Sequence, residues 1–258
     1  MTAALAHPWY MTERWLRALL RQPWYVAITL VQPVIWLLLF GALFKRVVEI
    51  PGFHSDSYID FLTPGIVVMT ALFSAGWNGM GMLNDLERGV VDRFLVSPVR
   101  RWALIAGPLT QLAIVIVIQS LIIVGLGLAV GASLPGGVPG VAVLIVCAVL
   151  LGACLGAVSN GLALLAREEE TLIAAVNFIV LPATFLSSTF MQQGLVPAWI
   201  SDIARFNPVN WTVEAGREAL GADVDWGLVL SRMGYLLALA IACAWFATRA
   251  FRAYQRSV

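Results

Sequence analysis

The chain has 258 residues, of which 60% are hydrophobic and 12% are charged, and its formal net charge is +1. Average soluble domains are about 45–50% apolar and about 25% charged, so this composition disfavours a water-soluble protein. The nearly balanced charge gives no electrostatic basis for binding nucleic acid. The composition therefore predicts an all-α integral membrane protein, with residues 1–258 forming a single transmembrane domain.

The few polar residues exclude several kinds of active site. Lys45 is the only lysine and Phe44 precedes it, so the P-loop pattern GxxxxGK[ST] does not occur. Any ATP hydrolysis must therefore take place on another polypeptide, and we expect this chain to be neither an enzyme nor a cofactor-binding protein. The cysteines lie inside apolar stretches and the two histidines lie outside them, so we expect no metal site.

Residues 8–22 predict a helix that lies in the membrane interface. Apolar residues recur at helical spacing on one face, while arginines gather on the other. The basic residues follow an aromatic pair, which is the reverse of a cleaved signal peptide. The residues that define this interface helix are Arg14, Trp15, Arg17 and Arg21.

Six apolar stretches are long enough to cross a membrane, since a crossing needs about 20 residues. The second of them is unusually polar for a crossing. We expect transmembrane helices at residues 24–44, 60–84, 104–131, 138–165, 171–190 and 227–248.

A charged segment, residues 85–98, separates the second crossing from the third. Its charges alternate in sign beside an apolar strip, and Ser97-Pro98 ends the helix because proline disfavours a helical residue before it. Such a helix, parallel to the membrane, suits docking into a groove on a cytosolic partner, whereas the composition fits an ordinary charged loop at the lipid headgroups equally well. The candidate docking residues are Glu87, Arg88, Gly89, Asp92, Arg93, Phe94, Leu95, Ser97 and Pro98.

Residues 195–220 form neither a plain loop nor a full crossing. Two short apolar pieces flank Asn207-Pro208, which is a strong helix breaker. Each piece has about half the length that a crossing needs, so we expect a re-entrant helical hairpin between the fifth and sixth crossings. Its candidate functional residues are Pro197, Trp199, Asn207, Pro208 and Arg217.

The distribution of basic residues predicts the orientation. With the N-terminus inside, eleven arginines lie on the cytoplasmic side and four basic residues lie outside. Since cytoplasmic segments carry the excess of basic residues, we expect a multi-pass protein of the cell membrane with both termini in the cytoplasm.

Polar residues within or near the crossings are candidates for lining a translocation path, although hydrogen bonds between helices explain such residues equally well. They include Asn78, Asn177, Ser187 and Ser188. No acidic residue or lysine lies near the middle of a crossing, which argues against an ion-coupled carrier.

Small residues recur at every fourth position in the fourth crossing, at Ala148, Gly152 and Gly156, and Asn160 follows. This spacing lets helix backbones approach closely. We expect packing within the subunit, and a dimer seam is the less favoured interpretation.

Two clusters of motifs carry a resemblance over essentially the whole chain. The first contains Phe61-Leu62-Thr63-Pro64-Gly65 and Glu87-Arg88-Gly89, followed by Ser97-Pro98. The second contains Ser187-Ser188-Thr189-Phe190 and Phe206-Asn207-Pro208, followed by Arg217. In this order they resemble the membrane subunit of ABC type-2 exporters, and the second cluster is similar to the daunorubicin-resistance and nodulation-factor exporter permeases.

The resemblance implies a six-helix subunit that dimerises, as a homodimer or with a related permease, and binds cytosolic nucleotide-binding subunits that carry ATP and Mg. It also implies that Glu87 to Pro98 form the coupling helix, and that the N-terminal interface helix contacts the ATPase. The hairpin would lie near the outer leaflet, at the exit of the path. Val90 departs from the threonine that often follows the glycine in this family.

We therefore expect the membrane subunit of an ATP-driven exporter of an amphipathic drug, polyketide or (glyco)lipid, with membrane lipids as its surroundings. An exporter of a lipid-linked polysaccharide precursor is the alternative within this class, with Trp36, Trp77, Trp199 and Trp211 as a possible aromatic belt. The alternative from another class is an ATP-independent carrier or assembly protein.

Overall fold

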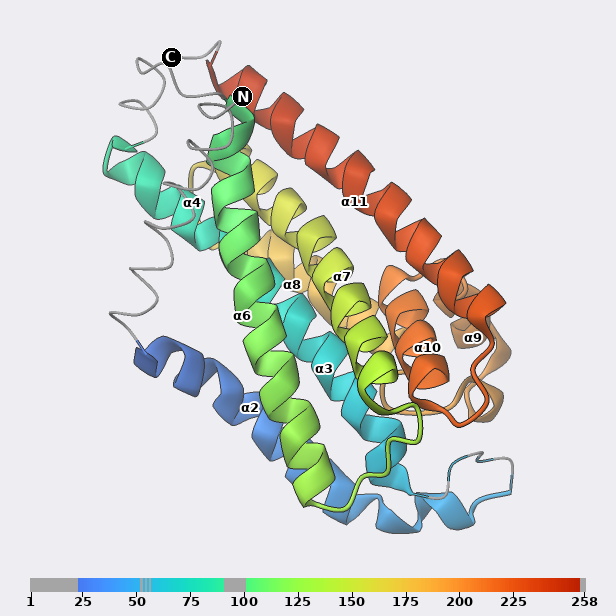
Figure 1. Cartoon of the computed structure of the whole chain (residues 1–258). Coiled ribbons are helices and arrows are strands. Elements are labelled where there is room, and N and C mark those ends of the chain that lie inside the picture. The colour runs from blue at the N-terminus through green and yellow to red at the C-terminus, as the bar shows by residue number, and fades with distance from the viewer. Residues whose placement is uncertain (1–22, 52, 54, 56, 91–100, 256–258) are drawn as a thin grey trace.

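The computed structural model describes residues 23–255, apart from residues 52, 54, 56 and 91–100 (Figure 1). These residues form helices and connecting turns, and no strand occurs among them, so the all-α prediction is confirmed for this part of the chain. The longer helices are α2 (Pro23–Leu43), α3 (Tyr58–Gly76), α4 (Asn78–Glu87), α6 (Arg101–Ala129), α7 (Gly137–Ala166), α8 (Glu169–Phe185), α10 (Pro208–Leu220) and α11 (Trp226–Gln255). The short ones are η1 (Lys45–Glu49), η2 (Gln193–Leu195) and α9 (Ala198–Ala204).

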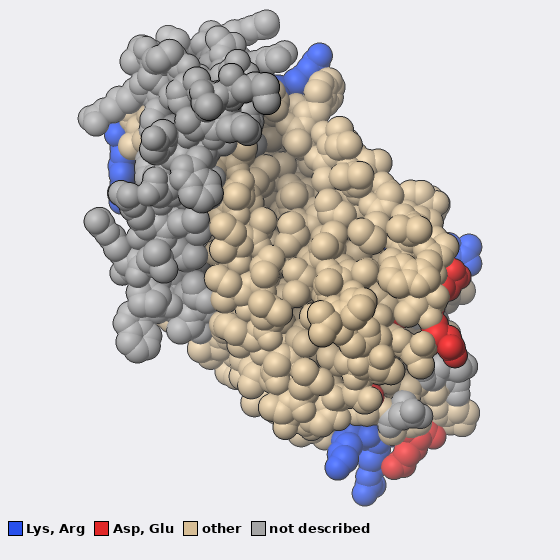
Figure 2. Space-filling view, in the orientation of Figure 1, with Lys and Arg blue, Asp and Glu red and all other residues tan. Residues whose placement is uncertain are grey.

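Four of the described helical stretches are long and apolar enough to cross a membrane: Tyr58–Glu87, Ala106–Ala129, Gly137–Ala166 and Trp226–Phe251. Two further helical stretches are shorter than these four. They are Ile28–Leu43 of α2 and the 17-residue α8. The prediction of six crossings therefore stays a prediction. The broad middle of the face in Figure 2 is largely uncharged, and charged side chains lie toward its margins, as a membrane-embedded surface requires.

The centre of the bundle is α3, which is buried without interruption from Phe61 to Leu72. It packs against α2, α6, α7 and α10, and α7 in turn packs against α11 (Figure 1). By contrast, most of α11 is exposed, with Ile241 and Trp245 among its exposed apolar side chains. An apolar side chain costs nothing when it faces lipid, so the exposed surface of α11 fits a lipid environment.

The helix predicted at 60–84 is interrupted at Trp77, which separates α3 from α4. At this break the N–H of Met80 donates to the carbonyl of Trp77, 3.1 Å away, so it does not reach the carbonyl of Gly76. The Ser159 hydroxyl of α7 donates to the Gly76 oxygen at 2.5 Å and accepts the N–H of Gly79 at 3.0 Å. One side chain therefore satisfies both backbone groups that the break exposes.

The small residues of α7 lie against α6 within the same subunit. A Cβ added at Gly152 would overlap the Ile116 side chain, and one added at Gly156 would overlap Leu112. Glycine at both positions thus lets α7 approach α6 closely, which supports packing within the subunit for this stripe.

Two bundle ends can be distinguished in Figure 1. One end, which we call the η1 end, carries η1, the turns that follow α6 and α8, and the loop that precedes α11. The opposite end, the α4 end, carries the ends of α4, α7 and α11. The predicted interface helix at 8–22 and the coupling residues Asp92 to Pro98 lie outside the described residues.

Candidate functional site: the hairpin and cavity at the η1 end

The break expected at Asn207-Pro208 lies between α9 and α10. Pro208 occupies the first turn of α10, where its missing N–H costs no hydrogen bond. Asn207 caps this helix, because its Oδ1 accepts the N–H of Val209 at 2.9 Å. Its Nδ2 donates to the carbonyls of Ala183 and Leu186 at 2.7 and 2.8 Å. One amide thus joins the beginning of α10 to the end of α8.

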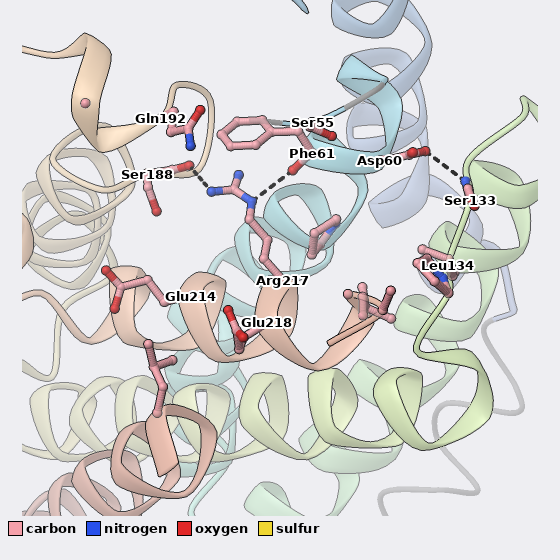
Figure 3. Close-up of a pocket in the computed structure, with 17 residues that line it drawn as sticks. Ser55, Asp60, Phe61, Ser133, Leu134, Ser188, Gln192, Glu214, Arg217 and Glu218 are labelled. Carbon is pink, nitrogen blue, oxygen red and sulfur yellow. Dashed lines mark hydrogen bonds between the residues drawn. The ribbon is translucent and has the colours of Figure 1, made fainter. Parts of the chain in front are cut away.

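Arg217, near the other end of α10, is bound to main-chain carbonyls from two segments (Figure 3). Its Nε donates to Phe61 at 3.1 Å, Nη1 to Ser188 at 2.7 Å and Nη2 to Thr189 at 3.0 Å. The Phe61 ring covers the guanidinium, with its centroid 3.4 Å from Cζ. Arg217 therefore holds the turn after α8 against the first turn of α3.

The charge of Arg217 depends on its surroundings. Desolvation lowers the pKa of the guanidinium, while the phenol of Tyr58 and the carboxylate of Glu214 act in the opposite direction. Because three carbonyls accept its N–H groups, the side chain remains a cation at neutral pH.

Two further side chains on the same face of α10 extend this network. The Oδ1 of Asn210 accepts the N–H of Ser188 at 3.0 Å, and its Nδ2 donates to Glu214 at 2.8 Å. Glu214 also pairs with Arg232 of α11, with Oε2 and Nε 2.9 Å apart. This ion pair is about three-quarters buried and connects α10 to α11.

The last turn of α10 packs directly on α7 through glycine. The N–H of Gly136 donates to the carbonyl of Leu220 at 2.9 Å. A Cβ at Gly136 or Gly140 would overlap the carbonyl oxygen of Ala219. Only glycine permits this approach, so α10 is fixed to the beginning of α7 as well as to α8.

A cavity of about 830 Å³ opens beside Arg217 at the η1 end (Figure 3). Its apolar wall includes Phe61, Pro64, Leu134 and Leu228, and polar groups come from Ser55, Ser188 and Gln192. The charged residues that line it are Asp60, Glu214, Arg217 and Glu218. A cavity of this size, with an apolar wall and a few polar groups, has the character of a site for a small organic molecule.

The four candidate path residues fall into two separate places. Ser187 and Ser188 lie in the turn after α8, the turn that Arg217 binds through its main-chain carbonyls, and Ser188 lines the cavity. Asn78 begins α4 at the break, and Asn177 follows Val176, whose side chain packs against Gly76 at the same break. The Nδ2 of Asn78 is buried without a hydrogen-bond partner among the described residues.

The four tryptophans come from four different segments of the chain. Trp36 of α2 stacks on Phe40 and lies near Phe190, whereas Trp211 of α10 packs against Tyr235. Trp77 lies at the helix break, and Trp199 is exposed on α9. The aromatic belt considered for a polysaccharide path stays a prediction.

The sequence analysis named Asn207 and Arg217 but missed Asn210 and Glu214, which lie between them on α10. Asn207, Asn210, Glu214 and Arg217 are spaced by three, four and three residues, which puts them on one face of a helix. This polar stripe in a largely buried helix was the signal that could have identified the site. Asp60 and Glu218 have no comparable pattern in the sequence.

Comparison with known proteins agrees with this architecture. Residues 8–220 match the ABC-2 type transporter family. The chain is 28% identical to the daunorubicin resistance ABC transporter permease protein DrrB1 of Streptomyces coeruleorubidus over 245 residues, or 93% of this chain and 83% of that protein. It is 29% identical to the putative transport permease ycf38 of Porphyra purpurea, over 82% and 72% of the two chains. It is 24% identical to the inner membrane transport permease YadH of Escherichia coli K12, over 83% of each chain. The chain therefore belongs to the ABC-2 type transporter family, as the membrane subunit of a transporter.

Proposed function

We propose that this chain is the membrane subunit of an ATP-driven exporter of amphipathic molecules. Membership of the ABC-2 family carries the proposal, together with the missing P-loop, since the chain must then obtain its energy from a separate ATPase subunit. ATP and Mg bind to that subunit. A second permease subunit, identical or related, completes the membrane part of the complex.

The proposed arrangement has six crossings in the cell membrane, with both termini in the cytoplasm. At the α4 end, Arg88 follows α4, Arg167 follows α7 and Arg249 lies near the end of α11. At the other end, η1 contains Lys45 and Arg46. The excess of arginine supports a cytoplasmic α4 end and an outward-facing η1 end. In this orientation α9 and α10 form a re-entrant hairpin at the outer side, beside the cavity.

The coupling segment begins at the described end of α4. Glu87 and Arg88 are exposed, and Gly89 ends the helix with a φ of +63°. Glycine adopts this left-handed conformation without strain, so the chain turns away from α4 at this point. The turn supports a change of direction into a segment that lies along the membrane and contacts the ATPase.

Co-purification with an ATPase tests the proposal. Tagged chain extracted in mild detergent should bring down a P-loop ATPase, and the complex in lipid vesicles should move an amphipathic fluorescent cargo only with ATP. A complex whose ATPase carries Lys→Ala in its own P-loop is the matched control and should not transport. Transport by the chain alone, or equal transport without ATP, would contradict the proposal.

Glu87→Arg should uncouple the complex without changing membrane insertion. The charge reversal acts on an exposed residue at the end of α4, so the fold should lose less than about 0.5 kcal/mol. We expect cargo-stimulated ATP hydrolysis to fall about fivefold or more, while the ATPase still co-purifies.

Glu170→Arg is the control for this prediction, because Glu170 is also exposed and lies in the first turn of α8 at the same end. It should change stimulation less than about twofold, since it costs only about 0.3–1 kcal/mol of helix-dipole interaction. Unchanged stimulation in Glu87→Arg would remove the coupling role from this residue. Proline is unsuitable at Gly89, because its φ is fixed near −65°.

A further inference from the structure

We infer that the cavity beside Arg217 binds an amphipathic organic amine, with the ammonium group between Glu218 and Asp60 and the apolar body against Phe61 and Leu228. The inference rests on the proposed function only in taking this amine as cargo, because the binding site itself follows from the groups that line the cavity.

The charges in the cavity favour a cation. Among the residues that the structure describes, three carboxylates line it, from Asp60, Glu214 and Glu218, against one guanidinium, that of Arg217. Glu214 is paired with Arg232, but Glu218 accepts only a neutral backbone donor in the described contacts, the N–H of Asp225 at 2.9 Å. A carboxylate held by a neutral donor keeps its full negative charge, so Glu218 is the best-placed partner for an ammonium group.

Arg217 does not present an anion site to the cavity. Its Nε, Nη1 and Nη2 all donate to main-chain carbonyls, and the Phe61 ring covers one face of the guanidinium. Recognition of a phosphate or carboxylate would require several of these N–H groups at once. Three of the five N–H groups already hold the polypeptide, and carboxylates of Asp60, Glu214 and Glu218 line the same cavity, so an anionic ligand is disfavoured.

Ser188 supplies an independent indication of a ligand. The residue lines the cavity and is only 5% exposed, yet its Oγ has no hydrogen-bond partner among the described residues. Buried polar atoms are normally paired, and an unpaired one carries a desolvation cost. The Oγ does not face the cavity in this rotamer, but rotation about χ1 of Ser188 brings it to the cavity wall, where it accepts an N–H from the ammonium group and the cost is relieved.

The remaining wall fits the apolar part of the ligand. Phe61, Pro64, Leu134 and Leu228 surround the charged groups, and the cavity measures about 830 Å³. Drug-sized molecules occupy cavities of about 300–1,000 Å³. The site therefore has room for a body of several rings or a long alkyl chain beside the ammonium.

Binding of a matched pair of probes tests the inference. The full chain, in nanodiscs of zwitterionic lipid, is titrated with a dansyl-labelled alkylamine and with the N-acetylated form of the same molecule. The two probes share an apolar body and differ in charge. We expect the amine to bind at least about tenfold more tightly, and added salt to weaken only the amine.

Glu218→Gln and Asp60→Asn should each reduce amine affinity by about 3- to 10-fold and leave the acetylated probe unchanged. Each amide keeps a carbonyl oxygen for the N–H of Asp225 or Ser133, so these two hydrogen bonds are retained. Glu49→Gln is the control, because Glu49 is exposed at the same end but does not line the cavity. Its amine affinity should equal that of the native chain.

Three results would overturn the inference. They are equal affinity for the amine and the acetylated amine, equal losses of amine affinity in Glu49→Gln and Glu218→Gln, and tighter binding of an alkyl phosphate probe than of the amine. The outcome is separate from that of the proposed function, since binding needs no ATPase. Amine binding without ATP-driven transport in the complex would contradict the exporter, whereas transport without amine binding would contradict this site.

Discussion

Arg217→Met should destabilise the η1 end by about 3–5 kcal/mol, because three main-chain carbonyls lose a charged donor in a partly buried setting. The carbonyls belong to Phe61, Ser188 and Thr189, so the turn after α8 loses the link to α3 that Arg217 makes and keeps the hydrogen bond that Tyr58 of α3 donates to the Phe190 carbonyl at 3.1 Å. Thermal unfolding of the purified chain measures the global loss. Amide hydrogen exchange of residues 186–192 measures the local one, and it should accelerate while the core of α7 stays protected.

Arg205→Met is the matched control in the same hairpin. Arg205 is 71% exposed, and its ion pair with Asp202 is 3.8 Å long, so its loss should cost less than about 0.5 kcal/mol. Arg217→Lys should fall between the two, because a lysine keeps the charge but cannot reproduce the planar fork. Equal effects of Arg217→Met and Arg205→Met would show that Arg217 does not stabilise the turn.

Ser159→Ala should cost about 2–4 kcal/mol, because the carbonyl of Gly76 and the N–H of Gly79 both lose their buried partner. The two lost hydrogen bonds lie at the junction of α3 and α4. Helix α4 would then be held less firmly, and the coupling segment follows α4. Thermal unfolding measures the stability. In the reconstituted complex, the number of cargo molecules moved per ATP should fall.

Thr70→Val is the control for this prediction. The Thr70 hydroxyl is also buried in α3, but it donates at 2.7 Å to Ile66 of its own helix, whose carbonyl keeps a main-chain donor. Its removal should cost less than about 1 kcal/mol. Gly79→Ala is a second variant, since its Cβ would lie 2.5 Å from the Ser159 carbonyl oxygen and push α4 from α7. If Ser159→Ala and Thr70→Val were equally stable, the bridging role of Ser159 would be wrong.

The helical class and the interruption at Asn207-Pro208 were predictable because both depend on local chemistry. Hydropathy over about 20 residues identifies apolar helices, and an Asn-Pro pair both breaks one helix and begins the next. The cap confirms the local reason, since the same Asn207 side chain accepts the N–H of Val209.

The break at Trp77 was not predicted, because the residue that stabilises it, Ser159, lies 80 residues from Gly79 and 83 residues from Gly76 in the sequence. The role of Arg217 was equally hidden. Its partners are main-chain carbonyls. Every residue has such a carbonyl, so the sequence does not show which of them accept a hydrogen bond from Arg217. The cavity depends on Asp60 and Glu218 from distant segments, which only the tertiary structure brings together.

The connections of α10 also determine which part of the η1 end is able to move. Asn207 joins the helix to α8, Arg217 joins it to α3 and the close approach at Gly136 joins it to α7. These contacts hold the four elements together, so bending α10 alone would break several of them. The cavity is completed by loop residues such as Ser55, Leu134 and Ala222. Access to it is therefore governed by loops, whose motions take nanoseconds to microseconds, and is faster than any displacement of the helices.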